Sequence, residues 1–261
     1  MSWILLSTGF QPGEINMKVD SLLAEWIRPQ EGVSVLRVYG WNPPAISIGY
    51  NQEEDEFDRS KLAEQGIDIV RRPTGGRAIL HWNEITYSVV THLERSSLKE
   101  IYHTLNCALL EGVRSLGINA ELIASGNSTQ QLYQQSVSAA CFSSSAKSEI
   151  QFGGRKLVGS AQRRLGEVVL QHGSLLLGPQ HLQLASLIAE DSPERKILIW
   201  QSLADHAIDA ETILGHPVDF EEAALHLKEG FEHSLGVSFQ DPPSSLLSEL
   251  QAIMEEFEVQ V

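Results

Sequence analysis

Residues 67–90 read IDIVRRPTGGRAILHWNEITYSVV, and this stretch decides how the rest of the chain is interpreted. One apolar run enters a basic turn, a second leaves it, and the alternating segment Ile85–Val90 follows, which predicts a strand, a tight turn and two further strands. Pro73 fixes one backbone angle, while Gly75 and Gly76 let backbone N–H groups approach a ligand without an intervening Cβ. Three arginines flank these glycines, namely Arg71, Arg72 and Arg77. Because guanidinium groups add further donors, the turn suits an anionic or thioester-linked ligand.

The bulk composition narrows the class of protein. The chain has 261 residues with 42% hydrophobic content, enough for one large domain, and its formal net charge of -15 argues against a binder of nucleic acid or of anionic membranes. No apolar run approaches the roughly 20 residues of a membrane span, and the first residues lack the features of a signal peptide. Two cysteines, Cys107 and Cys141, do not make a disulfide framework. We therefore expect a reducing, cytoplasmic location.

Hydrophobic periodicity predicts both helices and strands along the chain. The predicted helices cover residues 14–27, 58–65 and 98–116, and the predicted early strands cover residues 33–39 and 44–52. Residues 124–148 are polar and read as a long irregular loop. Loops of this length in compact domains are usually functional or mobile. The whole chain, 1–261, is expected to form a single domain, with a motif-bearing core at about 14–178 and a helical C-terminal part at 180–261.

A second segment with turn signals and basic residues spans residues 151–178. The pair Gly153-Gly154 predicts a hairpin turn, and GRKLVGSAQRR at 154–164 is joined through a turn at Gly166 to VVLQHGSLLL at 168–177. Two paired strands are the natural interpretation. The segments 71–77 and 155–164 together hold seven of the nineteen lysines and arginines, so an acidic protein would carry one positive opening if they meet.

The two motifs together resemble those of the biotin/lipoate protein ligase superfamily, over roughly residues 16–177. The resemblance implies an α+β fold, a mixed β-sheet with flanking helices on one side, as in the catalytic domain of that superfamily. It also implies that the first turn lines an acyl tunnel and that Lys156, in the second motif, lies at the acyl carbonyl. The implied substrate-binding residues are Arg71, Arg72, Thr74, Gly75, Gly76, Arg77, His81, Gly159, Ser160, Ala161 and His172. His81 and His172 each lie at a strand end, where a histidine either bonds a backbone carbonyl or lines the site and moves a proton.

Cys141 lies 15 positions before Lys156 in the string AACF, and this placement resembles the cysteine-dependent octanoyltransferases of Gram-positive type. The resemblance implies that the Cys141 thiolate is a nucleophile that holds the acyl group between carriers. An isolated cysteine is otherwise usually structural. Lys156 would either stabilise the thiolate or donate to the oxyanion of the tetrahedral intermediate, and the sequence does not separate these roles. Residues 143–148 depart from the transferase pattern, in which an aromatic residue commonly precedes the glutamate that matches Glu149, and this departure bears on the carrier preference rather than on the chemistry.

The resulting prediction is transfer of octanoyl from acyl carrier protein through Cys141 to a lysine of a lipoyl domain. The acceptor would belong to a 2-oxoacid dehydrogenase E2 subunit or to the glycine cleavage H protein. We expect no cofactor, and no metal held by the protein, because no group of His, Cys, Asp and Glu has metal-ligand spacing. One alternative is an ATP-dependent lipoate–protein ligase, which would use ATP and Mg²⁺. A third hypothesis is a non-catalytic module that docks lipoyl domains or acyl carriers.

Overall fold

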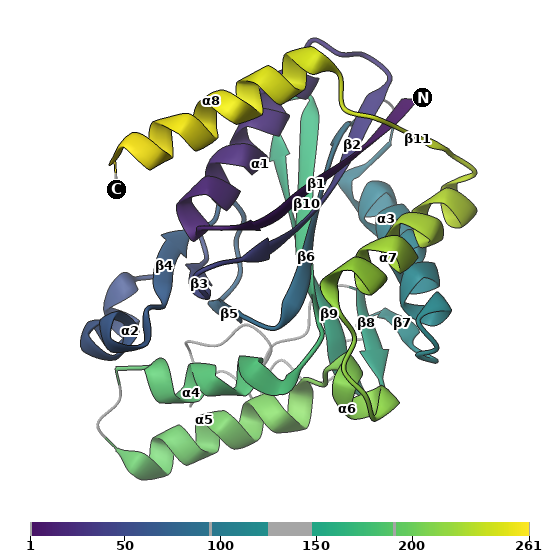
Figure 1. Cartoon of the computed structure of the whole chain (residues 1–261). Helices are drawn as coiled ribbons and strands as arrows, with labels where there is room; N and C mark the ends of the chain where they lie inside the picture. Colours follow the sequence, from purple (N-terminus) through teal and green to yellow (C-terminus); the bar gives the residue numbers. More distant parts are fainter. Residues whose placement is uncertain (1, 94–95, 125–147, 190–191, 261) are drawn as a thin grey trace.

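The computed structural model describes residues 2–93, 96–124, 148–189 and 192–260 of the chain (Figure 1). Within this part, a large mixed sheet has the strand order β11-β1-β2-β6-β10-β9-β8-β7. Its strands are β1 (Ser2–Gln11), β2 (Val33–Trp41), β6 (Glu84–His92), β7 (Glu121–Ala124), β8 (Ser148–Phe152), β9 (Arg155–Leu165), β10 (Val168–Leu176) and β11 (Phe239–Gln240). Strand β1 runs parallel to β2 and β11, and the other neighbours are antiparallel. The predicted α+β fold with a mixed sheet is confirmed.

A small second sheet carries the basic turn of the first motif. Its order is β4-β3-β5, with β3 (Ala45–Ile48), β4 (Asp68–Arg71) and β5 (Ile79–His81). Strand β3 pairs in parallel with β4 and antiparallel with β5. The predicted strands on either side of the turn therefore exist, but they do not pair with each other. Because the turn has to pass from one side of β3 to the other, it crosses the end of β3 at Ile48, whose carbonyl accepts a bond from the Arg72 amide.

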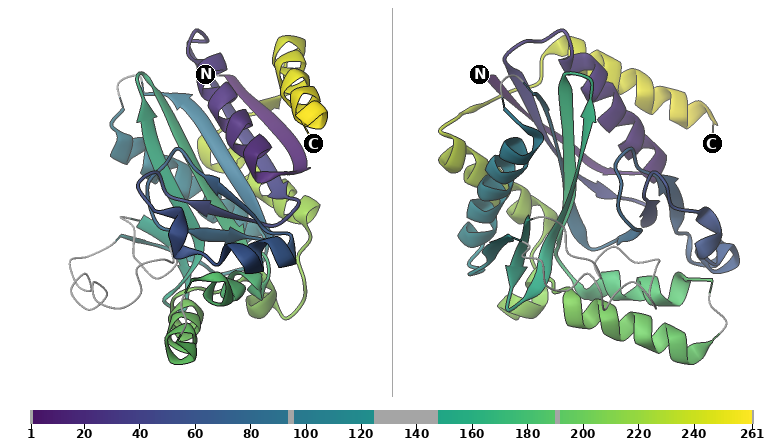
Figure 2. Two further views of the ribbon diagram at one scale, coloured as in Figure 1. Left: turned by 90° about the vertical axis from the view of Figure 1, so that its left-hand side faces the viewer. Right: turned by 180° about the vertical axis from the view of Figure 1, so that it is seen from behind.

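Helices cover both faces of the large sheet, so the expectation of helices on one side is wrong (Figures 1 and 2). Helices α1 (Gly13–Ile27) and α8 (Ser244–Gln260) pack together over one face, and α3 (Leu98–Ser115) and α7 (Phe220–Leu235) pack together over the other. The reason lies in the strands, which are apolar on both sides. In β2, Val35 joins the core beneath α1, whereas Leu36 and Val38 join the core beneath α3 and α7. Since both faces are apolar, both require cover.

Three further helices lie beside the small sheet: α2 (Arg59–Gln65), α4 (Leu184–Leu187) and α5 (Pro193–His206). Helix α6 (Ala210–Leu214) instead packs on the core beneath α3 and α7, and short 3₁₀ turns lie at Glu54–Glu56 and Pro179–Gln183. Leu184 and Leu187 of α4 and Leu203 of α5 share a core with the small sheet. The amide of Ile208, just after α5, donates to the carbonyl of Lys156 at 2.9 Å, which ties this helical layer to β9. Among the described residues, no helix combines the length and the apolar character needed to cross a membrane.

Candidate active site

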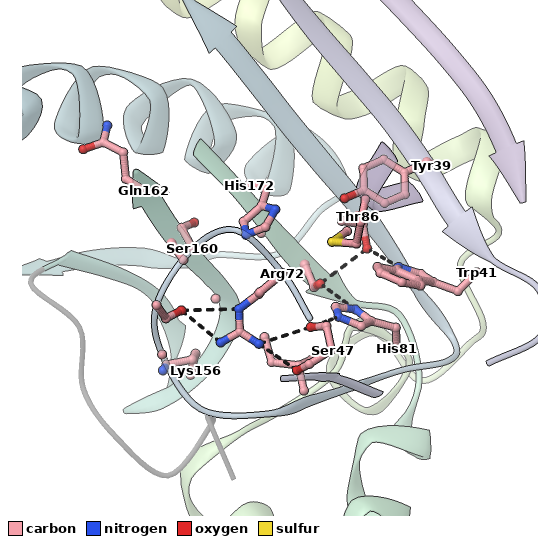
Figure 3. A pocket seen from close by; sticks show the side chains of 18 residues that line it. Tyr39, Trp41, Ser47, Arg72, His81, Thr86, Lys156, Ser160, Gln162 and His172 are labelled. Atoms are coloured by element: carbon pink, nitrogen blue, oxygen red, sulfur yellow. Dashed lines mark hydrogen bonds between the residues drawn. The ribbon is translucent and has the colours of Figure 1, made fainter. Parts of the chain in front are cut away.

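A cavity of about 270 Å³ lies where the two predicted motifs meet (Figure 3). Lys156 lies at one end of it, and Tyr39 and Trp41 lie at the other. Most of the predicted site residues line this cavity, namely Arg72, Gly75, Gly76, His81, Lys156, Gly159, Ser160, Ala161 and His172. They come from the turn before β5 and from β5, β9 and β10, so segments far apart in the sequence form one pocket. The side chains of Tyr39, Trp41 and Met17 make one end apolar, whereas the Lys156 end is polar.

Among the described residues, three of the predicted set are not among those that line the cavity, namely Arg71, Thr74 and Arg77. Thr74 is buried behind it, where its Oγ1 lies 2.5 Å from His172 Nε2. Arg71 donates to the carbonyl oxygens of the segment 49–52 rather than reaching the cavity. The carbonyl of Arg77 accepts a bond from Arg72 at 2.6 Å. Cys141 lies outside the described residues, so its predicted role as the nucleophile stays a prediction.

Arg72 has a structural task that the sequence did not indicate. Arg72 is 3% exposed, and its guanidinium donates to the carbonyl oxygens of Ser47 at 2.7 Å, Gly75 at 3.0 Å and Arg77 at 2.6 Å. Gly75 and Arg77 lie in the turn, which offers no strand partner for their carbonyls, and buried carbonyls need donors. The expected guanidinium fork toward a ligand is therefore largely used inside the protein to shape the turn. The two basic segments, whose meeting the sequence left open, do meet, because Arg163 donates to the Pro73 carbonyl.

Two glycines outside the predicted set make the closest backbone approaches of the site. A Cβ built on Gly49 would lie 1.9 Å from the carbonyl oxygen of Gly76, and one on Gly173 would lie 2.2 Å from that of Gly159. Gly76 itself has a φ of 100°, which disfavours any side chain. A Cβ on Gly75 would meet nothing within 4 Å. The strings ISIGY and QHGSL, which contain Gly49 and Gly173, belong to predicted strands. The need for glycine at these two positions arises from contacts with residues distant in sequence.

Lys156 is held by a carboxylate. Its Nζ lies 2.6 Å from Glu149 Oε1 on the neighbouring strand, and the two side chains are 7% and 4% exposed. Removing one partner of such a buried ion pair is destabilising, because the remaining charge is then buried without compensation. The sequence places Glu149 at the end of the segment that departs from the transferase pattern, without indicating a role in the site. The contact with Lys156 adds Glu149 to the candidate site.

His172 belongs to a buried charged network. Its Nδ1 lies 3.4 Å from Asp20 Oδ2, and the other oxygen of Asp20 accepts from Arg37 Nη1 at 2.8 Å and from Ser88 Oγ at 2.8 Å. Burial lowers the pKa of His172, although the hydrogen bond to Asp20 and its charge oppose this. Burial also acts to raise the pKa of Asp20, but the hydrogen bond with His172 and the charge of Arg37 outweigh it, so this pKa lies below its ordinary value.

His81 is fixed on both ring nitrogens. Its Nδ1 lies 2.7 Å from Glu84 Oε1 and its Nε2 lies 2.6 Å from Ser47 Oγ, while the ring stacks on Trp41 with centroids 4.0 Å apart. Of the two interpretations left open by the sequence, lining the site is thus the one that both histidines fit, since each has side-chain partners and borders the cavity. Among the described residues, no group of three or more His, Cys, Asp and Glu could hold a metal ion.

Comparison with known families decides what this arrangement belongs to. The model of the lipoyl protein ligase A/B catalytic domain matches residues 12–232. The chain belongs to this family. Among similar relatives are the octanoyltransferase LipM of Kyrpidia tusciae, 36% identical with 98% of this chain and 94% of the relative covered, and that of Symbiobacterium thermophilum, 38% identical with 91% and 88% covered.

Solved structures in the same family share the fold. The bipartite lipoate protein ligase of Thermoplasma acidophilum, described with its E2 lipoyl domain, has a TM-score of 0.74 at 21% identity and covers 98% of this chain and 92% of its own. A lipoate-protein ligase A bound with ATP has a TM-score of 0.71 at 22% identity, with 98% and 95% covered. The family predicted from the two motifs is confirmed.

Proposed function

We propose that the chain is an octanoyltransferase of lipoate biosynthesis, which passes octanoyl from acyl carrier protein through Cys141 to a lysine of a lipoyl domain. The observation that carries this proposal is the similarity to octanoyltransferases along nearly the whole chain, at 36% identity over 98% of its length. The ligases share the fold at much lower identity, so the fold alone does not favour ATP-dependent chemistry.

The cavity has the polarity that an aliphatic acyl group needs. Met17, Tyr39 and Trp41 offer an apolar end, and Lys156 lies at the opposite end (Figure 3). Burying a methylene group stabilises a complex by about 0.8 kcal/mol, so a chain of octanoyl length gains mainly from the apolar end. The acyl carbonyl would then lie toward Lys156.

In the first half-reaction, the Cys141 thiolate attacks the carbonyl carbon of the donor thioester. A new carbon–sulfur bond forms, the bond to the carrier thiol breaks, and the departing thiolate takes up the proton that Cys141 released. The Lys156 ammonium donates to the tetrahedral oxyanion or stabilises the thiolate. Glu149, at 2.6 Å, keeps that ammonium in position.

In the second half-reaction, the ε-amine of the acceptor lysine attacks the Cys141 thioester. The amide forms, the carbon–sulfur bond to Cys141 breaks, and the amine proton passes to the leaving thiolate. No nucleotide or metal enters either step. The acceptor is a lipoyl domain of an E2 subunit or of the glycine cleavage H protein, and the family resemblance to a ligase described with its E2 lipoyl domain supports this class of partner.

The test is the intact mass of the protein after mixing with octanoyl-acyl carrier protein in the absence of ATP. The expected result is an added octanoyl group on the wild type, absent from Cys141→Ala and discharged by a lipoyl-domain acceptor. Acceptor modification that requires free acid, ATP and Mg²⁺, and that survives Cys141→Ala, would establish the ligase instead. Binding of lipoyl domain or acyl carrier without any turnover would identify the docking module.

A further inference from the structure

Glu84, at the start of β6, is a buried carboxylate that receives an unusual concentration of hydrogen bonds. Its Oε1 accepts from Thr86 Oγ1 at 2.5 Å and from Ser174 Oγ at 2.7 Å, and it lies 2.7 Å from His81 Nδ1. The residue is 3% exposed and is not among those that line the cavity. Its second oxygen, Oε2, has no hydrogen-bond partner among the described residues. Three donors thus converge on a single oxygen atom.

The donor and acceptor capacities of the side chains determine the direction of the hydrogen bonds that connect Glu84 to Arg72. A carboxylate only accepts, so His81 Nδ1 carries a proton, and in the neutral imidazole its Nε2 is then the acceptor. The Ser47 hydroxyl, 2.6 Å from Nε2, must then donate to it. This leaves the lone pairs of Ser47 Oγ to accept from Arg72 Nη1 at 3.2 Å. The chain of bonds therefore runs from the guanidinium of Arg72 to the carboxylate of Glu84.

On the other side, Glu84 fixes the apolar end of the cavity. The indole Nε1 of Trp41 donates to Thr86 Oγ1 at 2.7 Å, which leaves the hydrogen of that hydroxyl for Glu84. Trp41 also stacks on the His81 ring with an interplanar angle of 10°. Both restraints on Trp41 therefore end on one carboxylate oxygen. Figure 3 shows the two branches, with Ser47 and Arg72 on one side of His81 and Thr86 and Trp41 on the other.

We propose that Glu84 is a positioning residue for acyl transfer, which holds both ends of the acyl cavity from one buried oxygen. Through His81 and Ser47, Glu84 orients Arg72, whose guanidinium donates to the Gly75 carbonyl in the turn. Through Thr86, it orients Trp41 at the apolar end. Glu84 itself makes no contact with the acyl group. This inference rests on the proposed function only in naming the ligand of the cavity as an acyl chain.

The first measurement is the protonation pattern of His81 in ¹⁵N-histidine-labelled protein without any substrate. In the wild type we expect a proton on Nδ1. Glu84→Gln keeps an acceptor oxygen in the same place and should retain that pattern, whereas Glu84→Leu removes the acceptor and should move the proton to Nε2. Because no carrier or acceptor is present, this readout stands even if the wild type transfers no octanoyl, which would overturn the proposed function alone.

The second measurement is octanoyl transfer by the same variants. We expect kcat/KM to fall by about 100-fold in Glu84→Leu, the usual cost of a displaced site, and by about tenfold in Glu84→Gln, which replaces charge-assisted bonds with weaker ones. Thr91→Val is the matched control for Thr86→Val. Both change a buried threonine of β6, but Thr91 bonds Ser34 and does not border the cavity, so Thr86→Val alone should impair transfer.

If Glu84→Leu does not fold, Ser47→Ala replaces it, since it removes a single oxygen and interrupts the chain between His81 and Arg72. Folding is checked by circular dichroism and thermal unfolding. Wild-type ¹⁵N shifts in a folded Glu84→Leu protein would overturn the proposal, and so would a wild-type kcat/KM in Ser47→Ala. So would a changed protonation pattern that leaves kcat/KM at its wild-type value.

Discussion

Glu149 Oε1 lies 2.6 Å from Lys156 Nζ, and both side chains are more than nine-tenths buried. Removal of one charge leaves the other buried without compensation, which typically costs about 3–5 kcal/mol. Lys156→Met should therefore lower the free energy of unfolding by about this amount, and Lys156→Met/Glu149→Gln should recover most of it. Urea unfolding of the two proteins measures the difference.

Octanoyl transfer separates this structural effect from the proposed catalytic one. Lys156→Met and the double variant should both lack transfer, because neither has an ammonium to stabilise the thiolate or the oxyanion. A double variant that regains transfer together with stability would show that Lys156 acts only by balancing the charge of Glu149.

The contact between Gly49 and Gly76 gives a second prediction. A Cβ at Gly49 would lie 1.9 Å from the Gly76 carbonyl oxygen, so Gly49→Ala must displace the turn that borders the cavity. Because a displacement of about 1 Å costs about 100-fold in rate, kcat/KM for octanoyl transfer should fall by that order. Gly75→Ala is the control for folding, since its Cβ meets no atom within 4 Å and its melting temperature should equal that of the wild type. Equal transfer rates for Gly49→Ala and wild type would contradict the assigned contact.

The third prediction concerns the dependence of stability on pH. Burial lowers the pKa of His172, and burial likewise lowers that of His181. Between the folded value and the unfolded value of about 6.5, the unfolded chain binds more protons, so the free energy of unfolding falls as pH decreases in that window. Above about pH 7 the contribution of these two groups to the free energy of unfolding is constant. Each histidine can change the slope of the free energy of unfolding against pH by at most about 1.4 kcal/mol per pH unit.

Thermal unfolding between pH 5 and 8 tests this for His172→Gln and His181→Gln separately. Each variant should have a shallower decline below about pH 6.5 than the wild type. The Asp20 carboxyl, with its lowered pKa, should add a further loss only in stronger acid, below its unfolded value of about 3.9. A wild-type slope in both histidine variants would assign the acid sensitivity to other groups.

Local features of this fold could be predicted from the sequence, because short-range rules govern them. Helix α3 was predicted at 98–116 and ends at Ser115, and Asp58 caps α2 while Gly66 ends it in the left-handed region. The glycines at 153 and 154 both have positive φ, as the predicted hairpin requires.

Features that depend on distant pairing were out of reach. The sequence contains no sign that β3 inserts between β4 and β5, or that Ser47 contacts His81. Ser47 and His81 are 34 positions apart, so their contact follows from the topology rather than from periodicity. Glu84 lies only three positions after His81, but the turn that brings its carboxylate to the histidine ring is not visible in the periodicity either.

The last prediction concerns Met17, which borders two separate spaces. It lines the cavity beside Tyr39 and Trp41, and it also lines an open groove of about 640 Å³ between α1, β4 and α8. Its side chain therefore lies between the apolar end of the cavity and the surface. Met17→Ala should join the two spaces and admit acyl chains longer than octanoyl.

The measurement is the ratio of kcat/KM for dodecanoyl and octanoyl carriers. We expect Met17→Ala to raise this ratio by at least tenfold, since each methylene that gains an apolar contact contributes about 0.8 kcal/mol. Leu22→Ala is the matched control, because Leu22 lines the groove but not the cavity, and its ratio should equal that of the wild type. An unchanged ratio in Met17→Ala would mean that the acyl chain does not extend to the Tyr39 and Trp41 end, and the proposed orientation of the substrate would have to be reversed.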